Sequence, residues 1–132
     1  MPPQTILADE TESFAAQEAI AFTLQRYVDG ARQGDTRLLR SAFAADARVS
    51  GSYGGKPVNW TLKEFCDVVE KGGPATDLKT RVVAIEYMGT AAMARLEAEN
   101  WRGTRYTDFF VLAGTDGTWR IDSKVFFAHS RA

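Results

Sequence analysis

Apolar residues recur at helical spacing in the first quarter of the chain. Asp9 or Thr11 can cap the start of this segment, and Asp9 with Glu12 has the spacing of a capping box. The positions that share one helical face are Phe14, Ala21, Leu24, Tyr27, Val28 and Ala31. Gly34 can end the helix in a left-handed conformation, so we predict one long amphipathic helix that runs to about Gln33.

Two shorter helices and two short strands are expected over residues 35–74. Asp35 can cap a helix whose apolar residues are Leu38, Leu39, Ala42 and Phe43. Thr61 and Glu64 form a second capping box, which opens a helix that ends at the Gly-Gly-Pro of residues 72–74. Between these helices, the turn around Gly54 separates short strands near 47–53 and 56–60.

From Leu78 onward the pattern changes to that of β-strands. Strands are predicted near 82–87, 91–101, 105–113 and 118–128. Tight turns at Gly89, Gly103 and Gly117 join them, and Asp116 before Gly117 is a strong hairpin signal. Helices followed by an antiparallel meander are typical of the α+β class and not of a doubly wound parallel sheet.

The last two strands carry large side chains on both faces. In the first of them, Thr107, Phe109 and Val111 alternate with Tyr106, Asp108, Phe110 and Leu112. In the second, simple alternation places Phe126 on one face and the following on the other: Trp119, Ile121, Val125 and Phe127. Helices can cover one face of this sheet. We expect the other face to pack against a second copy, which would give a homodimer through the sheet.

Composition narrows the possible chemistry. The chain has 132 residues, which suits one domain over 11–132 after a flexible N-terminus at 1–10. Its 16 basic and 17 acidic residues give a net charge of -1, so neither nucleic acid nor a membrane is an expected partner. The sequence shows no secretory signal, and a cytoplasmic location is expected. One Cys and one His exclude a thiolate zinc cluster and a multi-His metal site, and no cofactor is expected.

Several stretches resemble the nuclear transport factor 2-like superfamily. They are LQRYV at 24–28, AFAADARV at 42–49, YTDFF at 106–110 and DGTWRI at 116–121. Within the superfamily the chain is similar to the ketosteroid-isomerase-like and putative lumazine-binding groups, over about residues 12–127. The resemblance implies a cone-shaped, cystatin-like α+β fold, in which three N-terminal helices pack on a curved, mostly antiparallel sheet and enclose a pocket. It also implies dimers through the sheet.

The same resemblance suggests a polar site. Tyr27 and Asp108 match the oxyanion-hole residues of the isomerases, which makes them the candidate catalytic pair. The isomerase base corresponds to Gly51, so the residue that would take the α-proton is missing and steroid isomerase activity is not expected. Asp46 and Glu97 are substitute bases that the spacing leaves open. The strand that carries Glu97 leaves open which of its faces lines the pocket.

The residues themselves leave two interpretations of Asp108. A buried carboxylate must be paired or protonated, and Lys124 on the neighbouring strand is close to opposite it. Asp108 is therefore either a pocket acid or half of a structural ion pair. The candidate ligand-binding residues, some of which can stack on a flat ring, are Tyr27, Tyr53, Trp60, Tyr106, Asp108, Phe110 and Lys124. Aromatic residues at strand spacing are also common in an ordinary core.

Three functional hypotheses remain open. The first is a small-molecule-binding protein of the putative lumazine-binding type, with a planar heterocycle as its ligand. The second is a cofactor-independent acid–base enzyme of the isomerase, dehydratase or epoxide-hydrolase type, whose base is unidentified. The third is a non-catalytic dimer with a structural or protein-interaction role.

Overall fold

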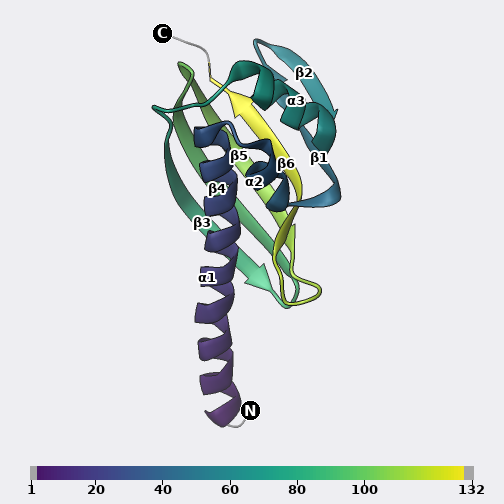
Figure 1. Cartoon of the computed structure of the whole chain (residues 1–132). Coiled ribbons are helices and arrows are strands. Elements are labelled where there is room, and N and C mark those ends of the chain that lie inside the picture. Colours follow the sequence, from purple (N-terminus) through teal and green to yellow (C-terminus); the bar gives the residue numbers. More distant parts are fainter. Residues whose placement is uncertain (1–2, 130–132) are drawn as a thin grey trace.

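The computed structural model describes the backbone of residues 3–129 and the side chains of residues 14–129. Three helices and six strands follow one another along the chain (Figure 1). The helices are α1 (Pro3–Gln33), α2 (Thr36–Ser41) and α3 (Leu62–Gly72). The strands are β1 (Phe43–Tyr53), β2 (Lys56–Thr61), β3 (Lys79–Met88), β4 (Ala91–Trp101), β5 (Thr104–Ala113) and β6 (Arg120–Ala128).

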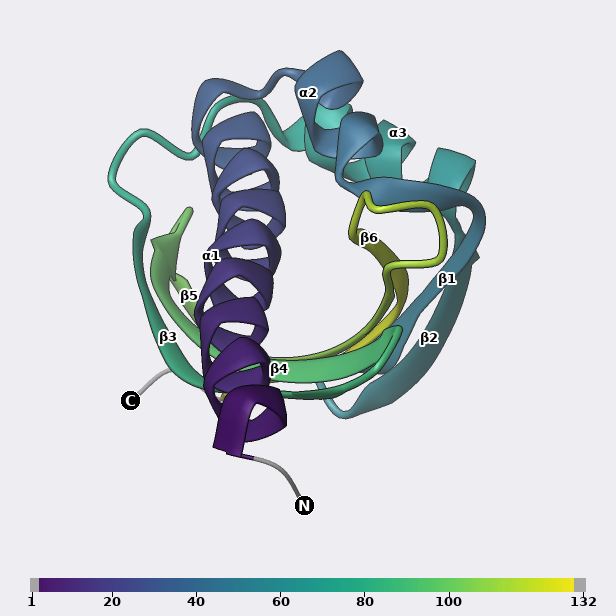
Figure 2. The ribbon, with the colours of Figure 1, turned by 90° about the horizontal axis from the view of Figure 1, so that it is seen from below.

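The strands form one curved sheet in the order β2-β1-β6-β5-β4-β3. All neighbours are antiparallel except β1 and β6, which are parallel. Figure 2 shows that the sheet curves around the helices, so that its concave face meets α1, α2 and α3 while its convex face lies outside. The predicted α+β fold with helices on a mostly antiparallel sheet is confirmed.

The helix α1 packs its C-terminal half against the sheet. Its buried side chains are Ile20, Leu24, Tyr27, Val28 and Ala31. Phe14 belongs to the predicted apolar stripe but is 69% exposed, because this end of the helix extends past the sheet (Figure 1). The helix begins at Pro3 and not near Asp9 or Thr11, so the backbone is helical on both sides of residue 10. Proline suits a first helical position because it has no N–H to leave unpaired.

Both predicted caps of the shorter helices are confirmed. The Asp35 carboxylate accepts hydrogen bonds from the backbone N–H groups of Arg37 and Leu38 at the start of α2. At the start of α3 the Thr61 hydroxyl accepts from the Glu64 N–H, and the Glu64 carboxylate accepts from the Thr61 N–H. Each cap satisfies backbone donors that have no partner inside the helix.

A bulge corrects the predicted faces of the last strand. Val111 pairs with Ser123 and Leu112 pairs with Ile121, so Asp122 is an extra residue in β6. The alternation therefore changes at Asp122. Trp119 and Ile121 point into the core, whereas Val125 and Phe127 lie on the convex face with 52% exposure each. The prediction that these four residues share a face is wrong.

Candidate functional site

A pocket of about 590 Å³ opens between α3 and the concave face of the sheet. β1 and β2 contribute Tyr53 and Trp60, α3 contributes Phe65 and Val69, and the β4–β5 end contributes Trp101, Arg102 and Tyr106; β6 adds Lys124 and Phe126. The pocket is therefore mostly lined by aromatic and aliphatic side chains, with three cationic residues among them. Such a lining is typical of a small-molecule site.

Two stacked ring pairs belong to the lining of the pocket. Trp60 and Phe126 lie with their centroids 6.0 Å apart and their planes 20° from parallel. Tyr53 and Tyr106 are 6.5 Å apart at 19°. Tyr106 also meets Phe126 edge-on at 5.8 Å, which joins the two pairs. All four rings belong to residues that line the pocket, and within each pair the ring planes are nearly parallel.

Lys124 is the polar residue at the inner end of the pocket. Its residue exposure is 3%, although it contributes to the pocket lining. Its amino group donates a hydrogen bond to the Tyr27 hydroxyl and lies 3.7 Å from Asp108 Oδ1. Rings surround the nitrogen at 4.7–5.4 Å from their centroids; they belong to Phe65, Tyr27, Phe126 and Trp101.

Asp108 lies behind Lys124 and is fully buried. The Tyr27 hydroxyl donates to Asp108 Oδ2 over 3.4 Å, so a chain of contacts runs from the amine through the phenol to the carboxyl group. Oδ1 has no hydrogen-bond partner among the described residues. The site therefore combines an amine at the pocket lining with a phenol and a carboxyl group that are buried behind it.

Burial decides the protonation of these three groups. Desolvation raises the pKa of Asp108, and the opposing effects of Lys124 and Tyr27 do not cancel it. Desolvation lowers the pKa of Lys124 in the same way, against the attraction of Asp108. Burial and the nearby Asp108 hold the pKa of Tyr27 well above its usual value, so this residue stays a phenol. Both partners of the Asp108–Lys124 contact are thus shifted toward their uncharged forms.

The structure brings most of the predicted site residues together. Tyr53, Trp60, Tyr106 and Lys124 line the pocket. Tyr27, Asp108 and Phe110 are also neighbours of this region but are fully buried and do not line it. The predicted contact between Asp108 and Lys124 is present, although it is diagonal: Asp108 pairs with Phe126 in the register, and Lys124 with Phe110.

Sequence reasoning missed part of the lining. Phe65 and Trp101 line the pocket but are not among the site residues predicted from the sequence. Asn100, with a φ of 60°, breaks the alternation of β4 just before Trp101, and this change of direction has no clear signal in the sequence. Phe126, in contrast, could have been found, because it is two residues from Lys124 and shares its face.

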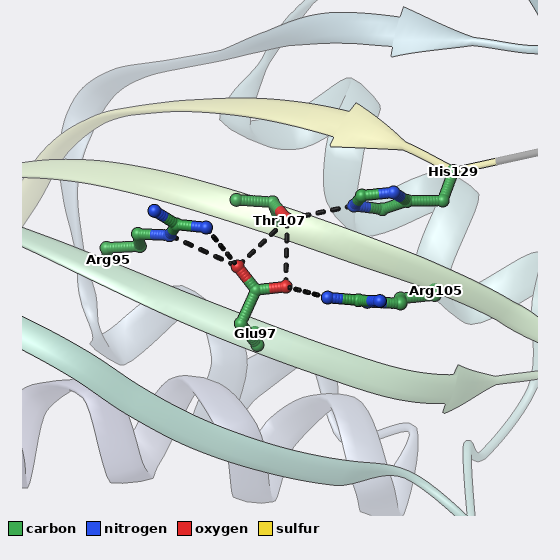
Figure 3. Close-up of polar contacts among 5 residues, drawn as sticks. All are labelled: Arg95, Glu97, Arg105, Thr107 and His129. Atoms are coloured by element: carbon green, nitrogen blue, oxygen red, sulfur yellow. Dashed lines mark hydrogen bonds and ion pairs between the residues drawn. The ribbon is translucent and has the colours of Figure 1, made fainter.

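None of the candidate bases lies in the pocket. Gly51 could not carry a side chain without a backbone shift, because an added Cβ would lie 2.1 Å from the carbonyl oxygen of Phe126. Asp46 is exposed on β1. Glu97 lies on the convex face, where its carboxylate accepts hydrogen bonds from other residues (Figure 3). The buried site therefore has Asp108 as its carboxyl group.

Hydrogen bonds around Glu97 show which face of β4 is polar. Arg95, Arg105 and Thr107 all donate to the Glu97 carboxylate, and Thr107 also meets the His129 ring nitrogen at 2.9 Å (Figure 3). The Glu97 side chain is consequently only 11% exposed. These hydrogen bonds outweigh the effect of desolvation and lower the pKa of Glu97. The charged face of β4 thus points away from the pocket.

The described part of the chain shows neither a membrane-spanning helix nor a metal-binding cluster. Within residues 3–129 no helix combines the length and the apolarity that crossing a membrane requires. Among the side chains of residues 14–129, no group of three or more His, Cys, Asp or Glu residues is arranged to bind a metal ion.

Comparisons with known proteins agree with this architecture. The model of the putative lumazine-binding family matches residues 15–127. The crystal structure of a nuclear transport factor 2-like protein of unknown function from Methylobacillus flagellatus superposes with a TM-score of 0.84. The two chains are 34% identical, and the match covers 88% of this chain and 94% of the Methylobacillus chain. A second such protein, from Shewanella baltica, is 29% identical and superposes with a TM-score of 0.85. The match covers 89% of this chain and 97% of the Shewanella chain.

A curated relative carries a functional name. Aldolase FrzH from Cladobotryum is 26% identical over 115 residues, which are 86% of this chain and 92% of the relative. The family match spans most of the residues that form the sheet and the pocket. This chain therefore belongs to the putative lumazine-binding family of the nuclear transport factor 2-like superfamily.

Proposed function

We propose that the protein binds a planar small molecule in the pocket between α3 and the sheet. The observation that carries this proposal is an aromatic pocket of about 590 Å³ with one buried amine at its inner end. Its volume lies in the range of ordinary small-molecule sites. A core that served stability alone would have no reason to place Lys124 beside an open cavity, because burying an amine costs free energy.

The lining indicates the kind of ligand. The Trp60 and Phe126 rings, and those of Tyr53 and Tyr106, offer flat surfaces for stacking on a heterocycle. The Lys124 amine and its neighbours favour a carbonyl oxygen or a ring nitrogen at the inner end. Lys71 also lines the pocket and adds positive charge, which suits an acidic substituent. Lumazine, a flat bicyclic heterocycle with carbonyl groups, is the natural first probe.

A thermal-shift titration tests this proposal. Lumazine and a panel of flat heterocycles should raise the melting temperature in a concentration-dependent way. Trp60→Ala should weaken the effect, whereas Phe22→Ala, at an exposed ring of α1, should leave it unchanged. If no planar compound stabilises the protein, or if Phe22→Ala weakens the effect as much as Trp60→Ala, the pocket is not the binding site.

A second candidate function is acid–base catalysis on a carbonyl compound, of the carbon–carbon bond-forming type. Two observations favour it: the buried group of Tyr27, Asp108 and Lys124, and the relative named an aldolase. Cleavage of a planar β-hydroxy ketone would reveal such activity, and it can be monitored through the aromatic aldehyde that it releases. The rate should fall in Lys124→Met and persist in Lys63→Met, a matched change at an exposed lysine.

We further propose that the convex face of the sheet pairs with a second copy of this chain. Phe109, Val111, Val125 and Phe127 are each 46–52% exposed there, and the helices all lie on the opposite face (Figure 2). The residues around this apolar patch carry both charge signs, including Arg95 and Glu99, so identical faces need not repel each other.

Light scattering during gel filtration tests the dimer. The protein should elute with twice the mass of one chain, and Phe109→Glu should give the mass of one chain while retaining the circular dichroism of the folded state. A monomeric wild-type protein at high concentration would contradict this proposal. So would a dimer that survives the change at Phe109.

A further inference from the structure

Lys124 differs from every other lysine in its environment. The remaining lysines, at positions 56, 63, 71 and 79, are all exposed. Lys124 is 3% exposed, lies at the inner end of an aromatic pocket and contacts a buried carboxyl group. An amine can attack a carbonyl carbon only in its uncharged form, because an ammonium ion has no free lone pair. Apolar surroundings favour that form, as in other nucleophilic lysines.

The groups that face Lys124 come from each element packed against it. Helix α1 contributes Tyr27, and β5 contributes Asp108. The other groups are rings from α3, β4 and β6, which bring no negative charge. Asp108 is the group among them that could hold the amine as an ammonium ion. The burial of Asp108 opposes the ionic form of the pair. A carboxylate there would accept one long hydrogen bond, from Tyr27, and its Oδ1 has no hydrogen-bond donor among the described residues.

We propose that Lys124 forms an imine with the carbonyl group of an aromatic aldehyde or ketone bound in the pocket. This inference rests on the proposed binding function, and it adds a covalent step and a substrate class. The stacked rings favour a planar ligand, and the inner end of the pocket receives its carbonyl group. A ligand without a carbonyl group can bind in the same place but cannot react.

The neighbouring groups supply the proton transfers that this step requires. The nitrogen lone pair attacks the carbonyl carbon, a C–N bond forms, and one proton is transferred from nitrogen to the carbonyl oxygen, which becomes a hydroxyl group. The hydroxyl group then takes up a second proton and leaves as water while the C=N bond forms, and the nitrogen loses its second proton to give the neutral imine. The Asp108 carboxyl group can give the second proton to the departing hydroxyl and receive the second one from nitrogen, directly or through Tyr27. One amine and one carbonyl group thus yield one imine and one water.

Reductive trapping tests the imine directly. The protein is incubated at neutral pH with naphthaldehyde and sodium cyanoborohydride, which converts an imine into a stable secondary amine. Peptide mass spectrometry then measures the added naphthylmethyl group at each lysine and at the N-terminal amine. We expect Lys124 to be modified at least about 10-fold faster than Lys63, because an ordinary lysine is almost fully protonated at this pH.

Variants separate the chemistry from the fold. Asp108→Asn keeps the amine and the approximate shape but removes the acid, so it should slow the modification of Lys124 by at least about 10-fold while leaving Lys63 unchanged. Lys124→Arg should remove the fast modification altogether. The wild-type ratio of Lys124 to Lys63 needs no variant and stays informative even if a variant does not fold.

The carbonyl-free analogue naphthalenemethanol distinguishes failure of this inference from failure of the proposed function. If the alcohol stabilises the protein against heat and Lys124 is modified no faster than Lys63, the pocket binds but the imine proposal is overturned. If neither the alcohol nor the aldehyde stabilises the protein and Lys124 is not modified, the binding function fails with it. Fast modification of Lys124, blocked by excess alcohol, supports both.

Discussion

The protonation state of the buried lysine leads to an unusual stability prediction. Lys124→Met removes the amine but keeps an unbranched side chain of similar length, so it leaves little empty space. If the pair were ionic, this change would leave the Asp108 carboxylate buried without its partner, at a cost of about 3–5 kcal/mol. In the structure both groups are shifted toward their neutral forms. For a neutral pair, which these directions favour, the main loss is one hydrogen bond to Tyr27, worth about 1 kcal/mol.

The pH dependence of this difference has a definite sign. Because the pKa of Lys124 is lowered on folding, the unfolded chain binds more protons at this residue between the lowered pKa and about 10.4. The wild-type free energy of unfolding therefore rises with pH across this window, and Lys124→Met lacks that contribution. The cost of the substitution should grow from neutral pH toward about pH 10.

Urea unfolding, followed by tryptophan fluorescence at several pH values, measures both quantities. Lys63→Met is the matched control, because that lysine is exposed and its ion pair with Asp67 lies at the surface. A loss of about 3 kcal/mol or more at neutral pH, shrinking as the pH approaches 10, would refute the reasoning. It would show an ionic Asp108–Lys124 pair, whose stabilisation disappears when the lysine loses its proton.

Other parts of the fold give independent tests. Gly51→Ala should lower the free energy of unfolding by about 1–3 kcal/mol or more, because the new methyl group meets the carbonyl oxygen of Phe126; Ser52→Ala on the same strand should have little effect in urea unfolding. Thr61→Ala should cost about 1 kcal/mol in the same assay, since it breaks the capping box of α3; an unchanged unfolding midpoint would contradict the role of this cap. Glu97→Gln should lower the denaturation midpoint at neutral pH. Because the pKa of Glu97 is lowered on folding, its contribution is present above about pH 4.5 and lost as the pH falls further, so a difference that persists in strong acid would argue against the network.

Local signals predicted the helices and most of the turns. Asp35 and Thr61 act on backbone groups only two or three residues away, so their role does not depend on the rest of the molecule. The α+β class follows similarly from the order of helical and alternating segments. The contact between Asp108 and Lys124 could also be predicted, because a hairpin at Asp116 brings the two strands together.

Predictions that required strict alternation were less successful. Asp122 adds a residue to β6, and Asn100 turns the chain before Trp101, so both strands change face at positions where the sequence shows no interruption. Phe14 follows the helical stripe but is exposed, and nothing in its own segment indicates where the sheet ends.

The sequence by itself thus determined the elements, their order and the residue types available for chemistry: one buried carboxyl group, a tyrosine and a lysine within a largely aromatic set. Only the tertiary structure decided which rings surround Lys124, that Gly51 has no room for a base, and that Glu97 faces outward. The physical reason is that helix caps and hairpin turns depend on neighbouring residues. The protonation of a buried amine depends instead on how much water the whole packed molecule excludes from it.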